Sequence, residues 1–114
     1  EGRKKDLINR GGEKISAEEI ENLILQHVAV KNVACVPMPD ERLGERMCAY
    51  VVLKAEQMLA LEDLVDFLNA KEIARFKLPE RLELVDDLPV STFGKVSKKI
   101  LGEWIADKVA AEGP

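Results

Sequence analysis

The chain has 114 residues, of which 46% are hydrophobic and 33% are charged, a balance typical of one folded domain with one hydrophobic core. Its net charge of −4 argues against general nucleic-acid binding, because that needs a basic surface to displace counterions. No apolar run approaches the ~18 residues of a membrane span, and no signal-peptide pattern is present. Neither nucleic acid nor a membrane is therefore expected as a partner.

The two cysteines, Cys35 and Cys48, lie in apolar segments typical of strands. They lack CxxC spacing and a histidine-rich neighbourhood, so a metal site is not expected. Both are expected to be small buried hydrophobic side chains in a reducing, cytoplasmic compartment. The chain begins at Glu1 without a methionine, which suggests a piece cut from a longer protein.

A hairpin and a helix are expected first. Residues 6–15 contain Gly11-Gly12 between two short β-prone runs, which indicates a turn. Ser16 can cap the following helix, and Glu19 three residues later completes a capping box. His27 is expected to end this helix, where a favourable contact with the helix dipole is a better interpretation than catalysis.

Two strands should follow the helix. One is expected at 33–36, ended by Pro37 and Pro39. The other is expected at 47–53, where nearly every residue is apolar, which indicates burial on both faces. The segment 40–45 between them is expected to be an exposed loop.

The remaining elements are a helix, a strand, a loop and a last helix. Apolar residues from 61 to 68 recur at helical spacing, and 82–85 alternates as a strand. Turn-forming residues fill 88–94, and Ser97 can cap the final helix. The order predicts an α+β fold, with an N-terminal β-hairpin, helices packed on a small three-stranded sheet and a C-terminal helix.

Two loops combine glycine with lysine in a way that packing does not explain. They are Asn9–Lys14 and Ser91–Val96. Glycine lets a backbone approach a ligand closely, and lysine adds a mobile cation. Neither loop is a Walker A motif. The chain also has no Ser/His/Asp set and no Cys/His pair, so catalysis by this chain alone is not expected.

The two loops, taken in order with their neighbours, resemble a known family. Residues 2–8, 11–15 and 18–21 are similar to the hinge motif of the adenylate-forming enzymes, which include acyl-CoA synthetases, peptide-synthetase adenylation domains and luciferases. Residues 76–79 and 88–98 are similar to the last two motifs of that superfamily. Residues 9–22 most resemble the stand-alone aryl-acid ligases, which activate 2,3-dihydroxybenzoate or salicylate for siderophore synthesis.

The resemblance implies a reaction of two steps. A carboxylate attacks the α-phosphate of ATP to give an acyl-adenylate and pyrophosphate. The thiol of phosphopantetheine on a carrier protein, or of CoA, then accepts the acyl group. A mobile C-terminal domain swings about a hinge between the steps and presents a different face to the same site.

The resemblance also implies roles for individual residues. Lys95 matches the catalytic lysine of the adenylating state, where a fixed cation stabilises the charge that gathers between two anions. Lys5 falls on the hinge position. Arg3 and Lys14 match residues that bind ATP. Gly11 and Gly12 match the loop that lines the pantetheine tunnel in the thioester-forming state.

Residues 1–5 would then be a hinge segment, 6–110 the C-terminal subdomain and 111–114 a frayed tail. The implied partners are the enzyme's own N-terminal adenylation domain, an aryl carrier protein and the aryl acid. ATP and Mg²⁺ would be bound mainly by the N-terminal domain. Lys31, Arg75 and Lys77 could meet an acidic carrier protein, although solvated surface charge is the better interpretation. Two alternatives remain open, namely a CoA synthetase and a non-catalytic α+β binding module.

Overall fold

The computed structural model describes residues 6–113, so Arg3 and Lys5 lie outside the described residues. The elements follow one another as β1 (Leu7–Arg10), β2 (Glu13–Ser16), α1 (Ala17–Ile24), β3 (Val30–Asp40), β4 (Gly44–Leu53), α2 (Leu61–Asn69), the 3₁₀ turn η1 (Arg75–Lys77), β5 (Arg81–Leu84) and α3 (Lys98–Glu112). The α+β class expected from the sequence is confirmed.

The sheet is larger than the three strands expected. Its order is β2-β1-β4-β3, and β5 pairs in parallel with β4. The N-terminal hairpin is part of this sheet, because Arg10 of β1 pairs with Gly44 at the start of β4. The same edge of β4 thus pairs with β1 near Gly44 and with β5 from Cys48 onward.

The expected end of a strand at Pro37 is wrong, because β3 continues through both prolines to Asp40. Proline lacks an N–H and is tolerated on a strand at the edge of a sheet, and β3 is such a strand. The expected loop 40–45 is correspondingly reduced to a turn at residues 41–43. The carboxylate of Asp40 accepts hydrogen bonds from the turn, at 2.8 Å from the amide of Leu43.

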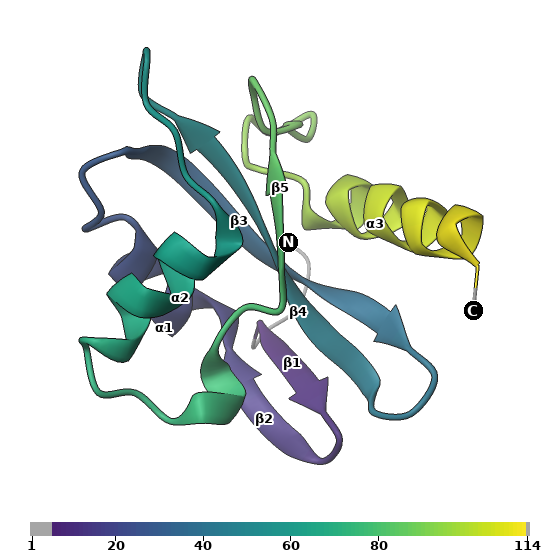
Figure 1. Ribbon diagram of the computed structural model, residues 1–114. Coiled ribbons are helices and arrows are strands. Elements are labelled where there is room, and N and C mark those ends of the chain that lie inside the picture. Colours follow the sequence, from purple (N-terminus) through teal and green to yellow (C-terminus); the bar gives the residue numbers. More distant parts are fainter. Residues whose placement is uncertain (1–5, 114) are drawn as a thin grey trace.

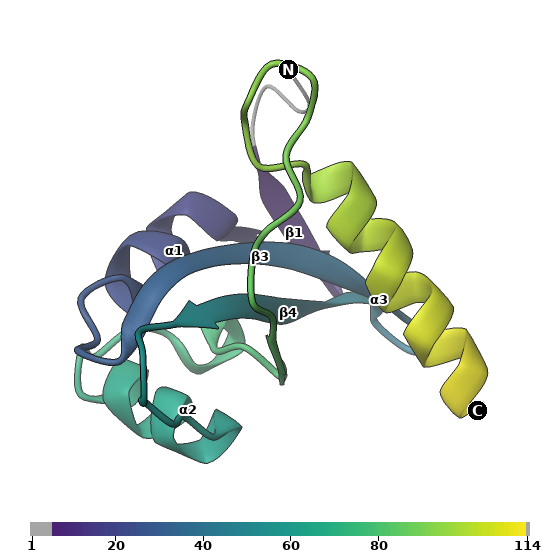
Figure 2. The ribbon, with the colours of Figure 1, turned by 90° about the horizontal axis from the view of Figure 1, so that it is seen from above.

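Helices cover both faces of the sheet, with α1 and α2 on one side and α3 on the other (Figures 1 and 2). The apolar side chains therefore form two clusters rather than the one core expected. Alternate residues of β4 belong to the two clusters. Val51 packs in the cluster beneath α1 and α2, and Tyr50 packs in the cluster beneath α3. The expected burial of this strand on both faces is confirmed.

Both serine caps are confirmed. Ser16 Oγ accepts from the amide of Glu19, and Ser97 Oγ accepts from the amide of Ile100, each at 3.2 Å. The expectation for His27 is wrong, because α1 ends at Ile24 and the Nδ1 atom of His27 accepts from the amide of Ala29. 

The C-terminal helix continues to Glu112 and so includes two residues of the segment 111–114, whose fraying stays a prediction. The Glu112 carboxylate pairs with the guanidinium of Arg81, which ties this end of α3 to β5. No helix within residues 6–113 has the length and apolar character needed to cross a membrane.

Candidate functional site

Lys95 lies in a short, closed loop between β5 and α3. Val90 and Val96 form an isolated bridge across its base. Within the loop, the amide of Ser91 donates to the carbonyl of Lys95 at 2.7 Å, and Gly94 adopts a φ of +81° that favours glycine. This backbone presents the side chains of Lys95 and Phe93 to solvent, and Phe93 is 82% exposed.

A groove runs beside this loop and reaches the first described residues of the chain. Its walls include Phe93 and Lys95 from the loop, Lys98 and Lys99 from the start of α3, and Asp6. Asp6 directly follows residues 1–5, the segment expected to be the hinge. The groove is therefore lined by an exposed lysine, by an exposed aromatic ring and by Asp6, the first described residue.

Lys98 joins these parts of the chain, although no role was expected for it from the sequence. Its ammonium group pairs with the carboxylate of Asp6 and lies 2.6 Å from Glu21 Oε2. Burial alone would lower the pKa of Lys98, but the hydrogen bonds to Asp6 and Glu21 outweigh it and raise the pKa. Its signals in the sequence were its place at the end of the segment 88–98 that resembles a family motif and at the start of the capped helix.

The Gly11-Gly12 turn joins β1 to β2, and the surroundings of its two glycines differ. Both have positive φ, +59° at Gly11 and +97° at Gly12. A Cβ on Gly11 would lie 2.8 Å from Cδ2 of Leu43, whereas a Cβ on Gly12 would meet nothing within 4 Å. A side chain at Gly11 would thus have to displace the end of the Leu43 side chain, while Gly12 faces open space.

The two loops lie at opposite ends of β1 (Figure 1). The groove beside Lys95 includes Asp6, directly before β1, and the glycine turn directly follows β1. At about 3.3 Å per residue, five residues of extended chain place the two regions roughly 17 Å apart. Lys14 belongs to the glycine end, exposed on β2 opposite Asn9. The structure therefore does not bring Lys95 together with Gly11, Gly12 or Lys14.

The described residues offer no ligand set for a metal. No group of at least three His, Cys, Asp or Glu side chains in residues 6–113 could hold an ion. Several carboxylates are instead engaged by cations, as Glu19 is by Lys77 at 3.1 Å. The Mg²⁺ implied by the family thus has no fit to this part of the chain.

Comparison with known proteins gives a consistent set of relatives. A family model described as AMP-binding enzyme C-terminal domain matches residues 19–95. Enterobactin synthase component E of Escherichia coli (strain K12) is 54% identical over 111 residues, which are 97% of this chain and 20% of that protein. A salicylyl-CoA synthase / salicylate adenylyltransferase of a Streptomyces species is 53% identical, over 95% of this chain and 20% of that protein.

A 2,3-dihydroxybenzoate-AMP ligase of Bacillus subtilis (strain 168) is 50% identical over 97% of this chain and 20% of that protein. The apo structure of Mycobacterium smegmatis MbtA superposes with a TM-score of 0.83 at 38% identity, over 90% of this chain and 19% of that one. The chain thus spans about a fifth of the length of the curated relatives it matches.

Proposed function

The chain belongs to the AMP-binding enzyme C-terminal domain family, and we propose that it is the mobile C-terminal part of an ATP-dependent aryl-acid ligase. The ligase would convert an aryl carboxylate and ATP into an acyl-adenylate and pyrophosphate. It would then pass the acyl group to the phosphopantetheine thiol of a carrier protein. The observation that carries this proposal is the exposed Lys95, which lines the same groove as Asp6, the residue that follows the expected hinge.

Lys95 is proposed to act in the first half-reaction. Negative charge accumulates where a carboxylate approaches the α-phosphate, and a positioned ammonium group lowers the barrier to that approach. The closed backbone of the loop supports this role, because it fixes the Cα of Lys95 while leaving its side chain free. The exposed ring of Phe93 would be covered when the loop docks on the rest of the enzyme.

The Gly11-Gly12 turn is proposed to act in the second half-reaction, as part of the passage for the thiol arm. Its location at the far end of β1 from Lys95 supports a domain that presents two different surfaces in turn. Arg3 and Lys14 are proposed to contact ATP, and Lys5 is proposed as the hinge. Lys14 keeps the charge of an arginine but not its bidentate geometry.

A CoA synthetase is the second candidate. The similarity to a protein named as both a salicylyl-CoA synthase and a salicylate adenylyltransferase favours it. The two acceptors are separated by supplying free CoA or a phosphopantetheinylated aryl carrier protein to the same enzyme. A cytoplasmic location belongs to the proposal as well, supported by two buried cysteines that are free thiols.

The test of the proposal is Lys95→Ala in the full-length enzyme. Acyl-adenylate formation, followed by pyrophosphate exchange with salicylate or 2,3-dihydroxybenzoate, should fall by about 10²–10³-fold. Thioester formation from supplied acyl-adenylate should stay close to normal. Lys99→Ala is the matched control, because Lys99 is an exposed lysine on the same groove. An equal loss of both half-reactions in Lys95→Ala would remove Lys95 from the first step.

A further inference from the structure

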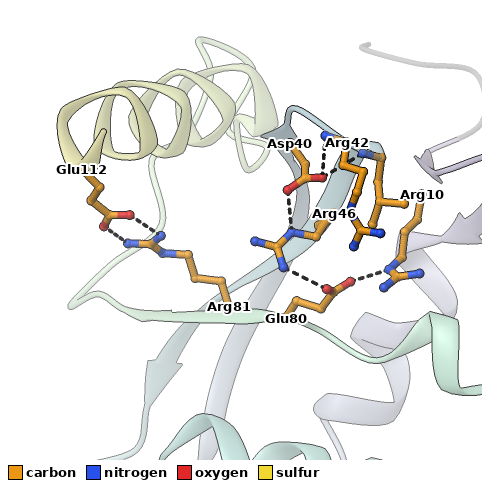
Figure 3. Close-up of polar contacts among 8 residues, drawn as sticks. Arg10, Asp40, Arg42, Arg46, Glu80, Arg81 and Glu112 are labelled. Atoms are coloured by element: carbon orange, nitrogen blue, oxygen red, sulfur yellow. Dashed lines mark hydrogen bonds and ion pairs between the residues drawn. The ribbon is translucent and has the colours of Figure 1, made fainter. Parts of the chain in front are cut away.

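A chain of ion pairs joins Arg10, Glu80, Arg46 and Asp40 (Figure 3), and Arg10 directly precedes the Gly11-Gly12 turn. The centre of these ion pairs is Glu80, whose carboxylate accepts from Arg10 Nε at 2.5 Å and from a terminal nitrogen of Arg46 at 3.1 Å. Arg46 Nε in turn lies 3.1 Å from Asp40 Oδ1, an ion pair without the geometry of a hydrogen bond. The four residues come from the end of β1, the facing ends of β3 and β4, and the segment before β5.

Glu80 is itself held in place by the sheet. Its amide donates to the carbonyl of Met47 at 3.0 Å, and its side chain is 23% exposed. Glu80 thus anchors the ion pairs at a backbone position fixed against β4. The hairpin has a single paired position with β4, Arg10 with Gly44, so side-chain contacts add to the few backbone contacts that hold its tip.

Two routes lead from Glu80 to the glycine turn. The first is direct, because Arg10 immediately precedes Gly11. The second passes through Arg46 to Asp40, whose carboxylate accepts from the amide of Leu43.

Leu43 then holds Gly11 by two contacts. Its carbonyl accepts from the amide of Gly11 at 2.9 Å, and its Cδ2 atom lies 2.8 Å from where a Cβ of Gly11 would be. Both routes therefore end on the same residue of the turn.

The carboxylates of Glu80 and Asp40 remain ionised at neutral pH. Burial alone would raise the pKa of Glu80, but the hydrogen bonds from Arg10 and Arg46 outweigh it and lower the pKa. The hydrogen bond from the Leu43 amide is the main reason that the pKa of Asp40 is lowered. Charge-assisted hydrogen bonds of this kind fix geometry more firmly than neutral ones.

We propose that Glu80 is a positioning residue for the thioester-forming half-reaction, because it holds the Gly11-Gly12 turn in place through Arg10 and through Arg46 and Asp40. The inference rests on the proposed function, in which this turn lines the passage for the thiol arm. Glu80 acts at the glycine end of β1 alone. The groove beside Lys95, at the other end of β1, is braced by a separate set of ion pairs, Lys98 with Asp6 and Glu21.

The test is Glu80→Gln in the full-length enzyme, which keeps the shape of the side chain and removes its charge. Thioester formation from supplied acyl-adenylate, with phosphopantetheinylated aryl carrier protein and with CoA, should fall by about tenfold, since a displacement of ~1 Å in a positioned group can cost that much or more. Pyrophosphate exchange should stay close to that of the parent, because Glu80 does not contact the loop of Lys95. Hydrogen exchange at the amides of Gly11 and Leu43 should become faster, because local opening exposes them.

Glu83→Gln is the matched control. Glu83 also bridges two cations, Arg81 at 2.7 Å and Lys108 at 2.7 Å, and its side chain is 15% exposed. Its partners join β5 to α3 and do not reach the glycine turn. This variant should leave both the thioester step and the hydrogen exchange at Gly11 unchanged.

The outcomes separate this inference from the proposed function. Glu80→Gln with an unchanged thioester step, with equal losses in both steps, or with an effect that Glu83→Gln reproduces would overturn the positioning role. If Gly12→Leu impairs thiol transfer while Glu80→Gln does not, the inference fails and the proposed function stands. If Gly12→Leu impairs both steps equally, the proposed passage fails, and hydrogen exchange still decides whether Glu80 holds the turn.

Discussion

The ammonium group of Lys98 lies 2.6 Å from Glu21 Oε2, and so joins the first turn of α3 to α1 around the edge of the sheet. The same oxygen of Glu21 accepts from the amide of Cys35 at 2.8 Å. Cys35 belongs to β3, an edge strand, whose outward amides need a partner other than a strand. Glu21 thus accepts a hydrogen bond from the edge strand and also pairs with Lys98, which pairs in addition with Asp6.

Lys98→Met should destabilise the 114-residue chain by about 1–3 kcal/mol, because it leaves partly buried carboxylates without their cation. Urea unfolding followed by circular dichroism measures this change. Lys99→Met is the control, since Lys99 is exposed on the neighbouring position of the same helix. Equal stabilities of the two variants would show that the pairing of Lys98 with Glu21 and Asp6 contributes nothing measurable.

Gly12→Leu in the full-length enzyme should impair thiol transfer and leave adenylation close to normal. The side chain would meet no atom of this domain within 4 Å, so any obstruction must involve what docks there. Any residue with a Cβ is also strained at the φ of +97°. Gly12→Ala introduces that backbone strain without the length of a leucine side chain. The difference in thioester rate between the two variants therefore measures obstruction, and a difference near zero would count against a passage at Gly12.

Local sequence was sufficient wherever a short-range rule decided the structure. Ser16 and Ser97 lie where a serine can cap the following helix, and both do so. The Gly11-Gly12 pair identified its turn because positive φ is costly for other residues. The exposed loop of Lys95 was expected from its turn-forming residues alone. Its chemical role came from the family motif and stays a prediction.

Relationships between distant segments could not be obtained in this way. Local rules predict that a strand ends at Pro37. The strand continues because it lies at the edge of the sheet, and only the order of the strands shows that position. Glu80 and Arg10 are 70 residues apart, and Lys98 and Asp6 are 92 apart. No rule of sequence spacing links such pairs. The ion pairs beside the glycine turn and beside the loop of Lys95 could therefore be found only in the folded chain.

Acid should weaken the fold in part through Glu80. Its pKa is lowered from 4.5 in the folded state, so its stabilising contribution is complete above about pH 4.5 and is lost as the pH falls through the folded value. The stability difference between the parent and Glu80→Gln should thus be largest near neutral pH and shrink on acidification to about pH 3. Urea unfolding of both proteins at the two pH values measures it. A difference that grows on acidification would have the wrong sign for a lowered pKa.

The two cysteines should resist thiol reagents in the folded chain. Cys35 and Cys48 are both 0% exposed. Burial raises the pKa of Cys48 to about 12, and burial also raises the pKa of Cys35 well above its ordinary value. The thiolate is the reactive form, so neither residue is activated near pH 8. They lie in different core clusters, on opposite faces of the sheet, which keeps them from forming a disulfide with each other. An aromatic disulfide reagent should therefore label both thiols in urea and neither in buffer, and rapid labelling of Cys48→Ala in buffer would mean that Cys35 is more accessible than its burial indicates.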